Sequence, residues 1–147
     1  MGPVTVTTDP AVIDLRLAHR WIESSYWATG IPWATFERAC THSLVYAALA
    51  AGEQVGFARV VTDQATFAWL ADVFVAEPAR GRGVASSLLA AIIADERLRG
   101  LRRFVLATAD AHPLYERFGF VRLGDRDDRL MAITRLASEL YGGDPPD

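Results

Sequence analysis

Three consecutive runs of β-type residues, joined by short turns, are the feature that most limits how this chain can fold. The runs cover Leu44–Ala50, Val55–Val61 and Phe67–Val75, with turn residues at positions 52–53 and 63–64. Hairpin-linked strands of this kind pair antiparallel with their neighbours. We therefore expect an antiparallel meander in the middle of the chain.

Helical periodicity flanks this meander on both sides, and further β-type runs occur at each end. The predicted order is β, α, α, β, β, β, α, β, α, β, β. This is a mixed α+β domain whose central, mostly antiparallel sheet is flanked by helices, not a doubly wound sheet. The expected outer strands are Val4–Thr7, Arg103–Ala107, Phe120–Val121 and Leu130–Thr134. Four helices are expected: one that begins at Asp9, one over Thr35–Thr41, one from Val84 to a stop at Gly100, and one from a cap at Asp110 to Gly119. In the third of these helices, Asp95 and Arg99 are expected to form an ion pair.

Length and composition indicate one globular domain that does not bind nucleic acid. A chain of 147 residues falls in the commonest domain size, and its 51% hydrophobic residues are enough for a sizeable core. We expect a single domain over residues 1–141 and a flexible tail at 142–147. The net charge of −3, with no block of like charges, does not suggest a nucleic-acid-binding protein.

The cysteine and histidine content gives no sign of a disulfide or a metal site. Cys40 is the only cysteine, and His19, His42 and His112 lack metal-ligand spacing. The first residues carry neither a basic stretch nor an apolar run, and no apolar segment reaches the roughly 18 residues of a membrane span. We therefore expect a cytoplasmic protein with no metal and no membrane partner.

The segment from Arg80 to Ser86 has the composition of an anion site. It belongs to the short loop that follows the third strand of the meander, contains Gly81 and Gly83, and leads directly into a helix. The first N–H groups of a helix lack intrahelical partners and lie at the positive end of its dipole, and glycines let a phosphate approach the backbone. Because Arg80 and Arg82 add two positive charges, the pattern favours a pyrophosphate ligand. A plain tight turn is the alternative.

The dinucleotide-binding fingerprint is a rival interpretation of the same glycines. Gly81-x-Gly83-x-x-Ser86 almost fits it, but its sixth position is serine and the preceding strand belongs to an antiparallel meander. The acidic residue expected about 20 positions further on is absent, because Asp95 and Glu96 come too early and lie on the helix. The context therefore argues against a dinucleotide site.

The segment Arg80-Gly81-Arg82-Gly83-Val84-Ala85 resembles the Arg/Gln-x-x-Gly-x-Gly/Ala signature of the GNAT superfamily of N-acetyltransferases. Residues 70–75 are similar to the strand that precedes this loop in the family, and residues 114–120 are similar to its Leu-Tyr-x-x-x-Gly-Phe segment. The resemblance covers roughly residues 44–134. It implies an acyl-CoA fold in which that strand carries a bulge and separates from its neighbour, with acetyl-CoA as the cosubstrate. The implied acetyl-CoA-binding residues are Val73, Phe74 and Val75, which would pair with pantetheine and the acetyl carbonyl, and Arg80, Gly81, Arg82, Gly83, Val84, Ala85 and Ser86, which would hold the pyrophosphate.

The resemblance also implies a catalytic role for Tyr115. Its hydroxyl would lie near the thioester sulfur and protonate the leaving CoA thiolate, a role that suits a phenol at neutral pH. Core packing is the alternative, because Leu114, Tyr115 and Phe118 share one helical face.

The general base is less defined. In relatives a glutamate can stand on the strand before the loop, and the corresponding position lies near Trp69. Asp72 is the only acid on this strand, and strand alternation points it away from Trp69, Val73 and Val75. Asp72 is therefore a candidate catalytic residue, with a structural or water-holding role as the alternative.

Aromatic residues between the first two helices are candidates for the acceptor pocket. They could receive an aromatic, alkyl or cationic amine, or could be ordinary core residues. We expect Cys40 to be a buried packing residue, whereas His112 either lines the site or decorates a helix start. The candidate pocket residues are Tyr26, Trp27, Pro32, Trp33 and Phe36.

Three functions follow from these patterns. The first is an N-acetyltransferase that transfers acetyl from acetyl-CoA to a primary amine, on a small molecule or a peptide. The second is a non-catalytic acyl-CoA sensor on the same fold, and the third is an adaptor whose arginine loop holds another phosphate. Tyr115 favours the first over the second. The oligomeric state stays open, with a homodimer among the alternatives.

Overall fold

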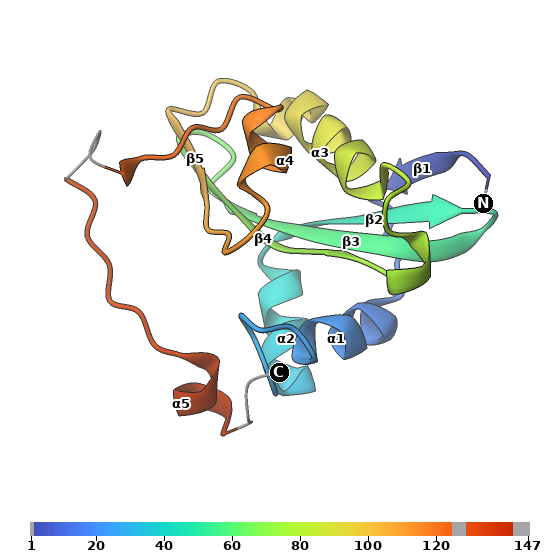
Figure 1. Cartoon of the computed structure of the whole chain (residues 1–147), viewed down its shortest axis with the longest axis horizontal. Helices are drawn as coiled ribbons and strands as arrows, with labels where there is room; N and C mark the ends of the chain where they lie inside the picture. Colours follow the sequence, from blue (N-terminus) through green and yellow to red (C-terminus); the bar gives the residue numbers. More distant parts are fainter. Residues whose placement is uncertain (1, 125–128, 143–147) are drawn as a thin grey trace.

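The computed structural model describes residues 2–124 and 129–142. A five-stranded sheet in the order β1-β2-β3-β4-β5 forms its centre (Figure 1). Strands β1 to β4 pair antiparallel, and β5 pairs parallel with β4, which confirms the predicted mixed α+β architecture. The elements are β1 (Val4–Thr7), α1 (Leu15–Glu23), α2 (Trp33–Thr41), β2 (Leu44–Ala50), β3 (Glu53–Thr62), β4 (Phe67–Val75), the 3-10 turn η1 (Glu77–Ala79), α3 (Val84–Ala94), the 3-10 turn η2 (Glu96–Leu98), β5 (Arg103–Leu106), α4 (His112–Glu116) and α5 (Ala137–Tyr141).

Two apolar clusters lie on opposite faces of the sheet. Helices α3 and α4 cover one face, and α1 and α2 cover the other (Figure 1). Leu88, Leu89 and Ile92 of α3 are fully buried against the first face, whereas Ile22 and Phe36 are fully buried against the second. Burying side chains of this size supplies the main driving force for folding.

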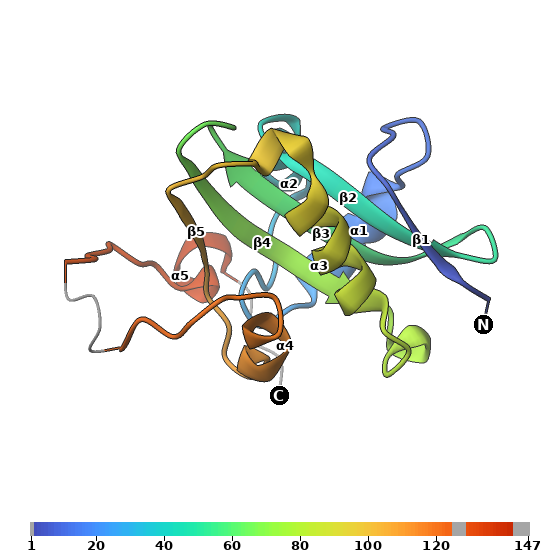
Figure 2. The same ribbon diagram turned by 90° about the horizontal axis from the view of Figure 1, so that it is seen from above.

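Helix α3 approaches the sheet closely because β3 carries a glycine beneath it. A Cβ atom at Gly56 would lie only 2.9 Å from Val84 Cγ1 and 3.2 Å from Leu88 Cδ1. Figure 2 looks down on α3 as it lies across the sheet. This contact places the first turn of α3 directly against β3, next to the strand from which the glycine loop departs.

The first helix begins later than the sequence predicts. Asp9 caps only a turn, in which its Oδ1 accepts from Ala11 N at 2.9 Å, and α1 starts after Asp14, whose Oδ1 accepts from Leu17 N at 3.0 Å. Both aspartates suit an N-cap, so local sequence does not decide between them.

The last turn predicted for α3 is also corrected. The helix ends at Ala94, and Asp95 forms its ion pair with Arg97 at 2.7 Å instead of with Arg99. Tyr46 of β2 donates to the same carboxylate at 2.7 Å, so a tertiary contact fixes where the helix stops. The cap predicted at Asp110 is likewise wrong, because Ala111 precedes α4.

The two predicted closing strands are absent from the described residues. Phe120–Val121 and Leu130–Thr134 have extended or irregular backbone with no ladder partner there, so a β-type composition alone does not make a strand. A short helix, α5, follows the second of them. The single domain over 1–141 stays a prediction, and the predicted tail at 142–147 lies, apart from Gly142, outside the described residues.

Candidate active site

The glycine loop is built as the sequence suggests, with a helix starting at its end. Gly81 and Gly83 have φ values of +77° and +78°, a conformation that favours glycine, and Gly83 is the residue that precedes α3. Within the described residues, no N–H group from Gly81 to Ser86 donates to a protein acceptor. A Cβ at either glycine would meet nothing within 4 Å. The loop therefore presents a set of unoccupied donors at the positive end of a helix dipole.

The two arginines of the loop are placed differently. Arg80 Nε donates to Val75 O at 3.0 Å, and its guanidinium carbon lies 5.4 Å from the centre of the Phe74 ring. Arg80 thus ties the loop to the end of β4, while Arg82 is exposed. Both still add positive charge beside the helix start.

Strand β4 carries the bulge that the resemblance implies. Phe57 lies opposite Phe74, but Arg59 lies opposite Ala71, so β4 contains one residue more than β3 between these pairs. Asp72 occupies the bulge with a φ of +56°. The extra residue changes which face the following side chains occupy, as bulges do.

A cleft opens where β4 and β5 stop pairing. Their last paired residues are Leu70 and Leu106, and beyond this point a cleft of about 1010 Å³ is lined by residues 71–75 of β4 and 107–111. Arg80 lines it as well, so the glycine loop lies at its border. Residues 73–75, which the resemblance assigns to acetyl-CoA, therefore belong to one wall of this cleft.

Asp72 lies on the face where α1 and α2 pack, held by Trp27, a candidate pocket residue, and by Arg59, which the sequence did not single out. Its carboxylate accepts from Trp27 Nε1 at 2.9 Å and from Arg59 Nε at 2.8 Å, and its side chain is 7% exposed. Arg59 also donates to Ser43 Oγ at 3.0 Å. Both carboxylate oxygens of Asp72 are thus engaged within the protein.

The predicted orientation of Asp72 relative to Trp69 is corrected by the bulge. Leu70 and Val73 both pack in the cluster beneath α3, although alternation would put residues three apart on opposite faces. Asp72 therefore shares a face with Trp69 while still pointing away from Val73. A bulge cannot be recognised from strand parity, because the parity argument assumes an unbroken strand.

Tyr115 of α4 lies beside the cleft with its hydroxyl available. The residue is 9% exposed, and within the described part of the chain its hydroxyl has no protein hydrogen-bond partner. Burial raises the pKa of Tyr115 to about 12, so the phenol stays neutral and able to donate at ordinary pH. Its ring packs edge-on against Phe120 at 6.1 Å, so packing and an available hydroxyl are combined in one residue.

The aromatic candidates for the acceptor pocket divide into two groups. Tyr26 and Trp27 line the cleft and are 49% and 39% exposed. Trp33 and Phe36 instead pack around His19 in the core and, like Pro32, do not line the cleft. Trp69 and Tyr141 also line the cleft, but they were not predicted as pocket residues because they come from a strand and a distant helix.

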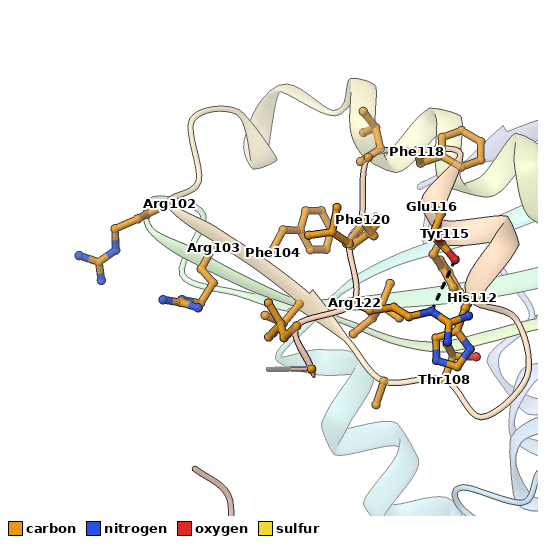
Figure 3. A pocket seen from close by; sticks show the side chains of 18 residues that line it. Arg102, Arg103, Phe104, Thr108, His112, Tyr115, Glu116, Phe118, Phe120 and Arg122 are labelled. Carbon is orange, nitrogen blue, oxygen red and sulfur yellow. Dashed lines mark ion pairs between the residues drawn. The ribbon is translucent and has the colours of Figure 1, made fainter. Parts of the chain in front are cut away.

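Cys40 is a packing residue, and His112 lies outside the cleft. Cys40 is buried in the α1–α2 cluster, and burial raises the pKa of its thiol to about 12. His112 lines a second cavity, which Tyr115 lines as well (Figure 3). Among the described residues, no group of three or more His, Cys, Asp or Glu could hold a metal ion. The described helices are all too short or too polar to cross a membrane.

Comparison with known proteins agrees with this geometry. The family model described as the acetyltransferase (GNAT) domain matches residues 41–122, more than half of the chain. The chain belongs to the GNAT acetyltransferase family. A protein from Xanthomonas campestris pv. campestris, described as an acetyltransferase of the GNAT family, is 44% identical in sequence to this GNAT protein. Its crystal structure matches this structure with a TM-score of 0.88, over 97% of this chain and 99% of that chain.

Two further similarities are more distant. A protein from Gibberella zeae that is named as an acetyltransferase is 28% identical, over 87% of this chain and 82% of its own length. An acetyltransferase from Clostridium acetobutylicum whose structure contains acetyl-CoA is 14% identical, with a TM-score of 0.65 over 90% of this chain and 96% of that chain. The last of these shows likeness of fold only. Family membership supports acetyl transfer as the general reaction.

Proposed function

We propose that this GNAT protein transfers an acetyl group from acetyl-CoA to a primary amine, on a small molecule or a peptide, by direct attack. The observation that carries the proposal is the groove between β4 and β5, because residues 73–75, Tyr115 and Arg80 all line it, and Arg80 leads directly into the N–H groups at the start of α3 that have no acceptor among the described residues. These N–H groups, residues 73–75 and Tyr115 suit, in that order, a pyrophosphate, a pantetheine amide chain and a thioester sulfur.

The reaction needs a neutral amine and a protonated leaving group. The amine nitrogen attacks the thioester carbon, a C–N bond forms, and the C–S bond breaks as the tetrahedral intermediate collapses. Tyr115 donates its proton to the departing sulfur as general acid, and the proton that the nitrogen loses returns through solvent to the phenolate. In total, one amine and one acetyl-CoA give one amide and one CoA thiol.

We assign Asp72 a structural role, and not the role of the general base. Both of its oxygens accept hydrogen bonds within the protein, from Trp27 and Arg59, and the side chain is only 7% exposed, so its contacts are those of a residue that holds the bulge in place. The side chain instead fixes the bulge next to the residues that would bind the acetyl carbonyl. Proton removal from the amine is then left to water in the cleft.

The test has two stages that use the same protein sample. Thermal unfolding is followed with acetyl-CoA, CoA and NAD, and at 100 times the dissociation constant a true ligand raises the stability by about 2.7 kcal/mol. Aromatic, aliphatic and peptide amines are then incubated with acetyl-CoA, and mass spectrometry detects acetylated product. Stabilisation by NAD but not by acetyl-CoA would contradict the proposal. Tight binding of acetyl-CoA without product from any amine would favour the sensor.

A further inference from the structure

Asp110 is a charged residue of the cleft that no other described residue neutralises. The sequence predicts that it caps α4, but the helix start has no hydrogen bond from this side chain. Thr108 takes that place, since its Oγ1 accepts from Ala111 N at 3.1 Å. Asp110 is exposed, lines the cleft, and forms no hydrogen bond or ion pair with another described residue. A carboxylate that stands in a cleft without a counter-charge attracts cations.

The other charged residues that line the cleft are engaged within the protein. Arg59 and Asp72 pair with each other at 2.8 Å, and their side chains are 16% and 7% exposed. Arg80 donates to Val75 O, at the end of the cleft where the glycine loop begins. Away from that loop, the described lining therefore offers one free negative charge and no free positive charge.

Asp110 also lies close to the residue that we assign as the general acid. Burial, then Tyr26 and then the charge of Asp110 raise the pKa of Tyr115 to about 12. Because the influence of one charge on another declines with distance, both groups lie near the Tyr115 hydroxyl. Tyr26 Oη accepts from Ala109 N at 3.1 Å, which ties the segment between α1 and α2 to the neighbour of Asp110. The free carboxylate therefore lies where the acetyl group would be transferred.

Two rings form an aromatic corner beside this segment. The planes of Tyr26 and Trp27 meet at 85°, with ring centres 5.0 Å apart, and both rings are exposed. Trp27 Nε1 donates to Asp72 at 2.9 Å, which holds the corner in place. Trp69 of β4 adds a third exposed ring to the lining of the cleft. Aromatic faces bind ammonium groups as well as apolar groups.

We propose that the acceptor is a monocationic primary amine with an apolar body and no carboxylate, whose ammonium binds to Asp110 while its body lies on the rings of Tyr26, Trp27 and Trp69. A carboxylate on the acceptor, as in a free amino acid, would meet the charge of Asp110 and find no free cation. A second ammonium, as in a diamine, would find no second free carboxylate among the described residues. This inference rests on the proposed function and narrows its acceptor.

Binding of the amine as an ammonium leaves the proposed reaction unchanged. Alkylamines are protonated at neutral pH, so the ammonium is the form that the cleft meets. After binding, one proton passes to water in the cleft before the nitrogen attacks, and one proton is released to solvent for each acetyl group transferred. Asp110 thus determines which amine binds, and Tyr115 remains the acid.

Matched amines test this charge rule. Phenylethylamine, phenylalanine amide and phenylalanine share a ring and an amino group, and they differ in carrying no further group, a neutral carboxamide or a carboxylate. In the thiol-release assay, kcat/KM should be about 10-fold or more lower for phenylalanine than for its amide. Hexylamine should exceed diaminohexane by a similar factor. Equal values for phenylalanine and its amide, or a preference for the diamine, would overturn the inference and leave acetyl transfer standing.

Asp110→Asn connects the charge rule to this residue. The variant should raise KM for phenylethylamine about 10-fold and bring phenylalanine to within about 3-fold of its amide, with the dissociation constant of acetyl-CoA unchanged. Glu116→Gln is the matched control, because it removes one negative charge from α4 but lines the second cavity and not the cleft. The control should keep the wild-type selectivity. Selectivity that survives in Asp110→Asn would contradict the inference.

Calorimetry separates this inference from the proposed function. Each amine is titrated into the complex of the protein with CoA, which has no acetyl group to transfer. Phenylethylamine should bind the wild type about 10-fold more tightly than Asp110→Asn, and phenylalanine should bind more weakly than its amide. This pattern without any acetylated product would contradict the proposed function alone. Equal binding of phenylalanine and its amide, or no binding of any amine, would overturn the inference.

Discussion

Asp72 combines a left-handed backbone, a buried side chain and two hydrogen bonds to its carboxylate. A non-glycine residue at positive φ is a local strain that surrounding contacts must hold. Trp27 supplies one of these contacts and Arg59 the other, so the acceptor-side loop and β3 are both tied to the bulge. At the residue scale, the bulge is the link between the two halves of the site.

Asp72→Asn tests whether this carboxylate positions the bulge or acts as base. The amide keeps one acceptor oxygen but leaves the 16%-exposed Arg59 without its ion pair, so unfolding free energy should fall by about 3 kcal/mol. Denaturant unfolding measures this, and the pH dependence of kcat should keep its shape in the variant. Unchanged stability together with loss of the acidic limb of the profile would instead identify Asp72 as the base.

Tyr115→Phe should slow the chemical step while leaving the cleft intact. We expect kcat and kcat/KM to fall together by about 100-fold, with the acetyl-CoA dissociation constant unchanged because the ring remains. Tyr26→Phe is the matched control, since Tyr26 lines the same cleft and its hydroxyl only accepts from Ala109 N at 3.1 Å. Full activity in the Tyr115 variant would make it a packing residue.

The pKa of Tyr115 adds a pH prediction. Burial raises it above the ordinary value of 10 to about 12, which favours the protonated phenol in the folded protein. The acid form is therefore retained as pH rises and is lost only near pH 12, so no alkaline limb from this residue should appear below about pH 10. Steady-state rates of the wild type and Tyr115→Phe across this range provide the comparison.

At the scale of elements, the strand–loop–helix unit β4–α3 was predictable, because glycines and apolar periodicity are local signals. The meander and its turns were predictable for the same reason. The bulge was not, since it arises from the register of β4 against β3 and not from the composition of β4. The helix ends and the closing strands were not predictable either, because they depend on contacts with distant residues. Tyr46 binds Asp95 at the end of α3, and residues 130–134 pair with no strand among the described residues.

Gly83→Asp tests whether the glycine loop binds CoA, and Gly52→Asp is the control at a glycine with the same backbone conformation. Gly83 and Gly52 both have a φ of +78°, and a Cβ at either meets nothing within 4 Å. Each aspartate should therefore cost similar stability, about 1 kcal/mol. Only Gly83→Asp places a negative charge at the helix start, so only this variant should lose CoA affinity in calorimetry. Unchanged affinity would mean that the loop is a turn alone.

The end of α3 gives a prediction on acid stability. Hydrogen bonding from Arg97, opposed by burial and helped by Tyr46, lowers the pKa of Asp95 from 3.8 to about 2. A lowered pKa in the folded state stabilises the protein above pH 3.8, and this contribution is lost as pH falls from 3.8 to 2. Asp95→Asn should therefore cost about 2 kcal/mol at pH 6 and nearly nothing at pH 2. A difference that is constant with pH would contradict this.

At the scale of the whole molecule, the sheet and its two helical layers form an active-site groove whose walls come from distant parts of the sequence. The loop after β4, the edge of β5, α4 and the segment between α1 and α2 meet there. The resemblance to the GNAT family drew attention to the loop and to Tyr115, and Arg80 of the loop and Tyr115 both line this groove. It pointed to Trp69 only as the position where relatives can carry a glutamate, and it gave no indication of Arg59 or Tyr141, because these two residues reach the groove only through the fold.

The most direct measurement is the rate of CoA thiol release from acetyl-CoA, with and without each amine of a panel. Thiol release should depend on an amine, rise to saturation with the amine concentration, and yield one acetylated amine per thiol. Gly83→Asp should lose this release, whereas Gly52→Asp should keep it. Thiol release at the same rate without any amine, or acetyl-CoA binding with no release in the presence of every amine, would contradict acetyl transfer to an amine.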